Sequence, residues 1–238
     1  MMGPVPRSRA PQRLDAIAAA ALATFAAAGY RGTRMADVAA AAGVSPGLLY
    51  TYAESKEALF ALVVQREAGV DITALALPVT TASDAELVAL VRAALDDLVA
   101  VRALAAAEAT DAPDDIDAEV AAIVAEHFDA ILSCRTLLRL VERCAADWPA
   151  LAAAFYEDGR QVHLARLARY LDRRRTAGLI APIDDSAIAA RFVLETIAWF
   201  ANHRFGDHDG AALDDDAVRR EVVALVTRAL TGRSDAER

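Results

Sequence analysis

A short stretch from Ser45 to Lys56 holds hydroxyl, apolar and positively charged side chains close together in the sequence. Ser45 and Thr51 bear hydroxyls that can hydrogen-bond to base edges, while Pro46 and Leu48 can pack against thymine methyl groups. Lys56 supplies a positive charge that suits a phosphate. For these groups to act together, one rigid element must present them on one face.

The elements that would position these groups are two short helices joined by a glycine turn. Ser45 is a good N-cap, and Pro46 suits the first helical position, where its missing N–H costs nothing. Upstream, Thr33 is expected to cap a helix over residues 34–41, and Gly43 lies in the turn. This order predicts a helix-turn-helix over about residues 34–53, whose second helix lies in the DNA major groove.

Residues 11–71 resemble the DNA-binding domain of the tetracycline-repressor (TetR) family of bacterial transcriptional regulators. The matching positions are spread at fixed spacing over the whole segment: Ile17, Ala20, Phe25, Gly29, Tyr30, Thr33, Asp37, Val38, Ala39, Gly43, Val44, Ser45, Leu49, Tyr50, Ser55, Lys56, Glu57 and Leu59. The family usually has an aromatic residue where this chain has Ala53, and commonly a small hydroxyl residue where it has Leu48. The resemblance implies a transcription regulator that binds DNA through this domain.

The expected DNA contacts lie on the second short helix and around it. They are Thr33, Arg34, Ser45, Pro46, Gly47, Leu48, Tyr50, Thr51, Tyr52 and Lys56. The helix carries no Arg, Asn or Gln, so it cannot make the bidentate base contacts typical of those residues. Base reading is therefore expected to depend on DNA shape or on Arg34, while Tyr50, Tyr52 and Lys56 are directed at phosphates.

The distribution of charge supports this placement, although the whole chain has a formal net charge of −9. Residues 1–58 hold six basic and four acidic side chains, a balance of +2, which leaves −11 for the rest. A mildly basic head on an acidic body orients a protein on phosphate. Lys56 is the only lysine, and its place in a first helical turn opposes the helix dipole. A phosphate contact is therefore favoured over a merely solvated side chain.

Residues 1–10 are expected to form a flexible basic arm, which either reaches an adjacent groove or remains a free tail. The alanine-rich segment that follows has features of a secretory signal. However, Asp15 lies at its start and its apolar residues recur at helical spacing, which favours an amphipathic first helix. No apolar run reaches the ~18 residues of a membrane span, and the expected location is the cytoplasm.

The composition predicts an all-α protein, because alanine supplies much of the 56% hydrophobic content and no useful strand-like alternation occurs. We expect roughly nine to ten helices. A three-helix helix-turn-helix domain over residues 11–71 is joined to a larger helical ligand-binding and dimerisation domain over residues 72–238. The predicted helices beyond the head cover residues 56–76, 83–109, 117–146 (with or without a break near Ser133), 149–176, 186–204 and 214–230.

The last two predicted helices are the candidates for a dimer interface. Apolar residues crowd more than one face of each helix, among them Ile188, Phe192, Trp199, Val222, Leu225 and Val226. The alternative is that these stripes face the chain's own core, as most helical stripes do. The family resemblance implies an intermolecular four-helix bundle, and two heads related by a two-fold axis would read a palindrome.

The resemblance also implies that the body binds a small effector that releases the operator. Residues that could line its pocket are His127, Phe128, Trp148, Phe155, Tyr156, Arg160, His163 and Tyr170, although each alone is more often ordinary core or surface. No cofactor or metal site is predicted. The polar stretch 202–209 has metal-binding residue types but is typical of a loop, and Cys134 and Cys144 form no metal or redox motif.

Two other classes of protein remain to be weighed. An enzyme on a helical scaffold would need a phosphate-binding glycine loop, a nucleophile elbow or paired metal ligands, and the sequence has none of these motifs. A helical interaction module that has lost DNA binding would fit Ala53 and the weak basic balance. We therefore predict a non-enzymatic, ligand-responsive repressor that binds a palindromic operator as a dimer, with DNA affinity separating it from the interaction module.

Overall fold

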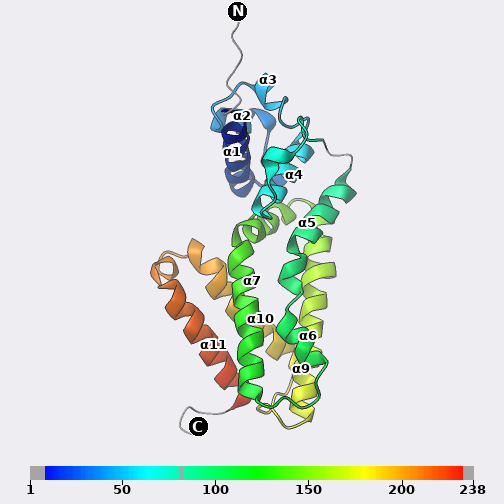
Figure 1. Ribbon diagram of the computed structural model, residues 1–238, viewed down its shortest axis with the longest axis vertical. Helices are drawn as coiled ribbons and strands as arrows, with labels where there is room; N and C mark the ends of the chain where they lie inside the picture. The colour runs from blue at the N-terminus through cyan, green and yellow to red at the C-terminus, as the bar shows by residue number, and fades with distance from the viewer. Residues whose placement is uncertain (1–8, 81–82, 233–238) are drawn as a thin grey trace, which may run out of the picture. The chain divides into compact units, whose positions relative to one another are not determined.

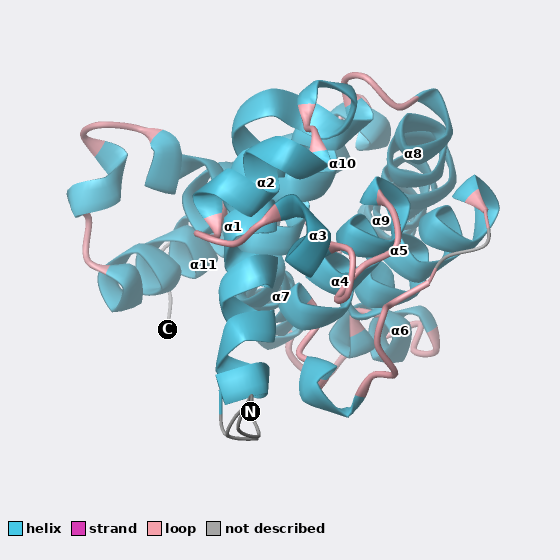
Figure 2. Cartoon of the chain, turned by 90° about the horizontal axis from the view of Figure 1, so that it is seen from above, coloured by secondary structure: helices cyan, strands magenta, loops and turns pink. Residues whose placement is uncertain are grey.

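The computed structural model describes residues 9–80 and 83–232, and it consists of helices joined by loops (Figures 1 and 2). Within these residues no strand is formed, and the nearest approach to one is an isolated bridge between Ala53 and Val79. The predicted all-α class is confirmed.

The chain divides into two compact units. The first unit comprises Met1–Leu95 with Thr136–Tyr156, and the second comprises Asp96–Arg135 with Glu157–Arg238. This spatial division differs from the boundary expected at residue 72, because a segment from the middle of the chain packs with its N-terminal part.

The helix-turn-helix elements lie in the first unit. They are α1 (Arg9–Gly32), α2 (Met35–Ala41), α3 (Pro46–Leu49) and α4 (Lys56–Glu67). Helix α1 packs against α2 and α4, and α2 packs against α3, as the blue to cyan ribbons of Figure 1 show. Ile17, Val38 and Leu49 are fully buried in the core between them. Since α3 is too short to be stable alone, this core holds it in place.

An aromatic cluster joins the middle of the chain to these N-terminal helices. Trp148, which directly precedes α8 (Pro149–Ala152), stacks on Tyr30 with ring centroids 4.3 Å apart. Phe60 of α4 meets Tyr30 and Trp148 edge-on at 5.5 and 5.6 Å, and Phe25 of α1 meets Phe60 at 5.2 Å. These four rings explain why residues 136–156 belong to the first unit.

The second unit is built from the remaining helices. Three of them contribute residues to both units: α5 (Asp84–Val99), α7 (Ile116–Ala145) and a π-helical segment (Ala153–Gln161). The others are α6 (Arg102–Glu108), α9 (Val162–Thr176), α10 (Ser186–Ala201) and α11 (Asp215–Thr231). Helix α10 packs against α9 and α11, and α6 packs against α9.

Three predicted helix limits are wrong. The helix predicted over residues 56–76 ends at Glu67, and a 3₁₀ turn (Ile72–Ala74) follows. The helix predicted over residues 186–204 ends at Ala201. The helix predicted over residues 83–109 is two helices, because the Glu126 carboxylate accepts the N–H groups of Arg102 and Ala103 at 2.9 and 2.7 Å and so caps a new helix start.

Helix α7 runs without a break through Ser133, where a break was one of the two expectations. The Ser133 hydroxyl donates to the Ala130 carbonyl at 2.8 Å, so the side chain is satisfied by its own helix and does not interrupt it.

Candidate nucleic-acid interface

The turn between α2 and α3 has the capping chemistry that the sequence predicts. Ser45 lies in an extended conformation, and its hydroxyl oxygen accepts the N–H of Leu48 at 3.2 Å. Pro46 occupies the first helical position, and Leu49 is the buried residue of the helix. The cap, the proline and one apolar anchor therefore set the direction in which α3 points.

The ten predicted contact residues differ in exposure. Exposed are Arg34, Ser45, Pro46, Gly47, Tyr50 and Thr51, half-buried are Leu48 and Lys56, and buried are Thr33 and Tyr52. The exposed set is concentrated on α3 and the residues directly after it. A DNA duplex approaching this side would meet these residues first.

Gly47 is a glycine that the chain's own packing does not require. A Cβ atom added there would meet no atom of the described residues within 4 Å, and the Gly47 backbone does not have the positive φ that favours glycine. A side chain at this position would project from α3 into open space. The open face therefore suits close approach by an external surface.

Ser45 and Thr51 present complementary hydrogen-bonding groups. The Thr51 hydroxyl donates to the Leu48 carbonyl at 2.7 Å, so its lone pairs are left to accept. The Ser45 oxygen already accepts from Leu48 N–H, so its O–H is left to donate. Between them, the two side chains can address both donor and acceptor edges of bases.

Two of the predicted contacts are committed to the fold. The predicted N-cap role of Thr33 is wrong: α2 is preceded by Arg34 without a side-chain cap, and the Thr33 hydroxyl donates to the Gly29 carbonyl at 2.7 Å. Tyr52 is only 7% exposed, and its carbonyl accepts the Val79 N–H at 2.8 Å. Their side chains serve the core more than the surface.

Lys56 ties α4 to the end of α1. Its Nζ donates to the Tyr30 carbonyl at 3.1 Å and lies 4.5 Å from the centre of the Tyr30 ring. The Tyr30 hydroxyl in turn donates to the Glu57 carboxylate at 2.8 Å, and burial with this bond raises the pKa of Tyr30. Lys56 thus holds the helix-turn-helix together, and only its remaining N–H donors are left for a phosphate.

The departure at Ala53 has a structural counterpart. Ala53 is fully buried, and the backbone of Val79 pairs on both sides of it, donating to Tyr52 and accepting from Glu54 N–H at 3.1 Å. A small side chain allows the segment around Val79 to approach this closely. The junction between α3 and α4 is therefore closed by backbone pairing.

The eight residues suggested for an effector pocket are divided between the two units. Trp148, Phe155 and Tyr156 lie in the first unit, and His127, Phe128, Arg160, His163 and Tyr170 lie in the second. Trp148 belongs to the aromatic cluster described above. Arg160 forms an ion pair with Glu195, and the Tyr170 hydroxyl donates to Glu119 at 2.8 Å.

His127 and His163 form a buried pair in the second unit. Their Nε2 atoms are 2.5 Å apart, and the two side chains are 1% and 5% exposed. His127 Nδ1 lies 2.9 Å from the Ile123 carbonyl, so this nitrogen carries its proton and His127 Nε2 accepts from His163. His163 Nδ1 is then an acceptor without a partner in the described structure.

Stability is expected to fall in mild acid because of this pair. Burial lowers the pKa of both rings, that of His163 from 6.5 to about 3. Below pH 6.5 the unfolded chain therefore binds a proton on this ring that the folded chain does not bind. Protonation of His163 alone lowers the free energy of unfolding by roughly 2 kcal/mol at about pH 5. We expect the free energy of unfolding, measured with denaturant, to fall less between about pH 7.5 and pH 5 for His163→Gln than for the unaltered protein. His203→Gln, at an exposed histidine, should show the same fall in free energy of unfolding as the unaltered protein. An equal fall in all three proteins would contradict the prediction.

The predicted interface residues of α10 and α11 separate into two groups. Ile188, Phe192, Trp199 and Leu225 are 69%, 55%, 39% and 56% exposed, while Val222 and Val226 are buried. The two valines therefore face the chain's own core, as the alternative interpretation has it. The other four form apolar surface on the outside.

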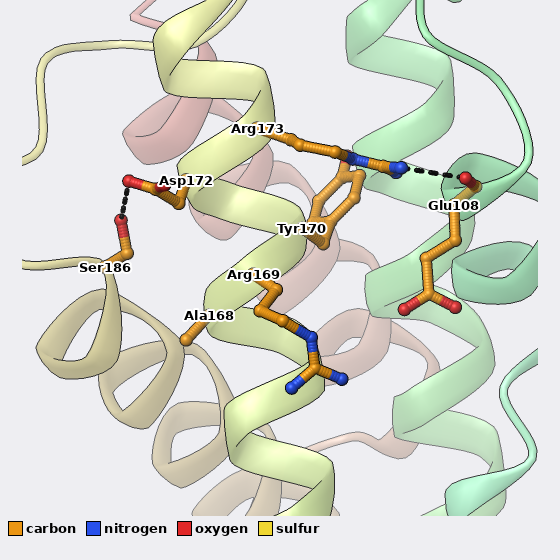
Figure 3. A pocket seen from close by; sticks show the side chains of 7 residues that line it. All are labelled: Glu108, Ala168, Arg169, Tyr170, Asp172, Arg173 and Ser186. Atoms are coloured by element: carbon orange, nitrogen blue, oxygen red, sulfur yellow. Dashed lines mark hydrogen bonds between the residues drawn. The ribbon is translucent and has the colours of Figure 1, made fainter.

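A groove of about 610 Å³ lies in the second unit between α6, α9 and the start of α10 (Figure 3). It is lined by Glu108, Ala168, Arg169, Tyr170, Asp172, Arg173 and Ser186. Tyr170 alone was among the predicted pocket residues. The others were missed because a sequence does not show which side of α9 faces α6, although the repeated arginines from Arg166 to Arg175 are a visible signal.

These features define a class of protein: helical transcription regulators that bind DNA through an N-terminal helix-turn-helix. Residues 17–63 match the model of bacterial regulatory proteins of the tetR family, and residues 122–231 match the C-terminal domain of AefR-like transcriptional repressors. Together the two matches cover most of the chain, which belongs to the TetR family of bacterial transcriptional regulators. The predicted DNA-binding regulator is confirmed, and the class is not one of enzymes.

Solved structures of other transcriptional regulators share the fold. The regulator PfmR from Thermus thermophilus aligns with a TM-score of 0.54 and 18% identity, over 98% of this chain and 99% of that one. The ketosteroid transcriptional regulator KstR2 of Mycobacterium tuberculosis aligns with a TM-score of 0.54 and 19% identity, over 96% and 97%. No curated protein sequence matches the chain.

Two further features bear on binding. Among residues 9–80 and 83–232, no helix has both the length and the apolar character needed to cross a membrane. In the same residues, no group of three or more His, Cys, Asp or Glu side chains is arranged to hold a metal ion.

Proposed function

We propose that this regulator is a repressor that binds a palindromic operator as a homodimer in the cytoplasm and is released when a small effector binds its second unit. The observation that carries the proposal is the exposed α3 face around Gly47, where Ser45, Pro46 and Thr51 project from a helix anchored by Leu49. Arg34 and Tyr50 flank this face and are exposed as well.

The apolar surface of α10 and α11 supports a dimer. Ile188, Phe192 and Trp199 recur at spacings of four and seven residues, which places them on one face of α10. Helix α11, which packs against α10, adds the exposed Leu225. Several large exposed apolar side chains on one helix face, unlike a single one, mark an interaction surface. One short α3 reads few base pairs, whereas two heads related by symmetry read twice as many.

The contacts that α1 makes with the end of α7 and with Asp147, just after it, suggest how a bound effector would act on the head. Arg143 Nη2 donates to the Ala27 carbonyl at 3.3 Å, and the Arg31 N–H donates to Asp147 Oδ2 at 3.2 Å. Gly29 (φ 77°) lies against both side chains, since a Cβ there would come within 2.6 Å of each. Because α7 contributes residues to both units, an effector that shifts its first part would also displace these contacts.

The direct test is selection of binding sequences from a random duplex library with purified protein, followed by titration of the selected sequence at two salt concentrations. A palindromic sequence with steep salt dependence is expected. If a folded, ligand-free protein enriched no sequence, the proposal would fail, and an interaction module would be the better assignment.

The variant Phe192→Glu is expected to weaken dimerisation about 100-fold, because it places a charge in the centre of the proposed apolar contact. Sedimentation equilibrium should show a monomer at concentrations where the unaltered protein is dimeric, and binding to the palindrome should weaken in parallel. Val162, which is 60% exposed on α9, provides the matched control Val162→Glu. If both variants remained dimeric, the interface would have to lie elsewhere.

A further inference from the structure

The groove between α6 and α9 brings two arginines to one face of one helix. Arg169 and Arg173 are one turn apart on α9, so they start from the same face of the helix, and both line the groove. Figure 3 shows Arg173 extending from α9 to the end of α6 at Glu108, while the Arg169 side chain runs along α9 below it. The volume of about 610 Å³ is within the range of small-molecule sites.

The two carboxylates that line the groove are already neutralised by other arginines. Arg166 holds Glu108 with two prongs, its Nε 2.9 Å and its Nη2 2.6 Å from Oε2. Arg175 Nη2 lies 2.7 Å from Asp172 Oδ1. Glu108 and Asp172 therefore do not neutralise the charges of Arg169 and Arg173.

No carboxylate of the described residues pairs with Arg169 or Arg173. Arg173 donates to the main-chain carbonyls of Glu108 and Ala107 at 2.8 and 3.0 Å, which carry no formal charge. Within the described residues, the exposed Arg169 makes no hydrogen bond or ion pair at all. The groove thus holds two uncompensated positive charges in a protein whose net charge is −9.

The remaining polar lining adds donors rather than negative charge. Ser186 opens α10, where the helix dipole is positive, and its hydroxyl is within 3.4 Å of Asp172 Oδ1. The Tyr170 hydroxyl is turned to Glu119 and is not offered to the groove. A bound molecule would accordingly meet guanidinium N–H groups first.

We propose that this groove binds a small anion with two negatively charged groups, one for each of Arg169 and Arg173. Arginines one helical turn apart, with Cβ atoms about 5–6 Å apart, can direct their guanidinium groups to two phosphoryl or two carboxylate groups of one molecule. The site is separate from the α3 face, and its occupancy does not depend on the proposed operator binding. Arg169 supplies the free fork, and Arg173 supplies a second charge already fixed against α6.

The test is isothermal titration calorimetry of the full chain, without DNA, at constant ionic strength. Pyrophosphate and succinate serve as probes for phosphoryl and carboxylate ligands, and sodium chloride serves as the blank. We expect saturable binding of at least one probe, and Arg169→Gln should weaken it roughly 10- to 100-fold, the effect of removing a charge-assisted contact.

Arg139 provides the matched control, because it too is an exposed arginine on a helix with no ion pair among the described residues. Arg139→Gln makes the same change of charge and should leave affinity for the probe unchanged. Which probe binds more tightly identifies the chemistry of the two anionic groups. An absence of binding to either probe, or an equal loss in both variants, would overturn the proposal.

Discussion

Trp148→Ala is expected to lower the free energy of unfolding by about 3–5 kcal/mol, the usual cost of removing a large buried aromatic side chain. Trp148 is 5% exposed, stacks on Tyr30 and meets the edge of Phe60. Its loss would leave a cavity between α4 and the segment that precedes α8, and the other rings cannot collapse into it without moving α1. Urea unfolding of the variant and of the unaltered protein, at the same protein concentration, measures the difference in free energy of unfolding.

The matched comparison is Tyr50→Ala, which removes an aromatic ring from the surface of the same unit. Tyr50 is 48% exposed, so its removal should change stability by about 0.5 kcal/mol or less while weakening DNA binding. If Trp148→Ala were as stable as Tyr50→Ala, the aromatic cluster would not be what joins residues 136–156 to the head.

Gly47→Glu is expected to reduce affinity for the operator about 100-fold or more without loss of stability. A Cβ at this position meets no atom of the described residues within 4 Å, glutamate is a better helix former than glycine, and an acid suits the first turn of α3. On the DNA, however, it would place a negative charge against phosphates, which costs several kcal/mol. Fluorescence anisotropy with the selected duplex and thermal unfolding measure the two effects.

Two further variants separate the location of that charge from its sign. Ala118→Glu adds the same charge at an exposed position in the first turn of α7 and should leave operator affinity within a few-fold. Gly47→Ala adds only a methyl group, so an intermediate loss would show how closely the duplex approaches. Equal effects of the two glutamates would mean that net charge, and not the α3 face, governs binding.

The helix-turn-helix could be predicted from the sequence because its signals are local. The Ser45 cap, Pro46 at the first helical position and the glycine turn act over a few residues, and each has the expected geometry. The same is true of the long helical runs of the body, whose alanine-rich composition favours helix wherever it is packed.

Features that depend on contacts between distant residues could not be predicted in this way. The break between α5 and α6 depends on the Glu126 carboxylate, more than twenty residues away along the chain. Lys56 has the residue type of a phosphate anchor, but its Nζ donates a hydrogen bond to the Tyr30 carbonyl. Trp148 has the residue type of a pocket wall, but Tyr30 and Phe60 surround it.

The sequence by itself determined the all-α class, the family and the turn that presents α3, because capping, helix propensity and apolar spacing act between neighbours. Only the tertiary structure decided which of the apolar residues of α10 and α11 are exposed and which arginines of α9 line the groove. It also decided that residues 136–156 pack with the N-terminal helices. Burial and charge compensation are set by groups brought together across the chain. For this reason, several residues that were predicted from their type to contact DNA or an effector instead pack or hydrogen-bond within the chain.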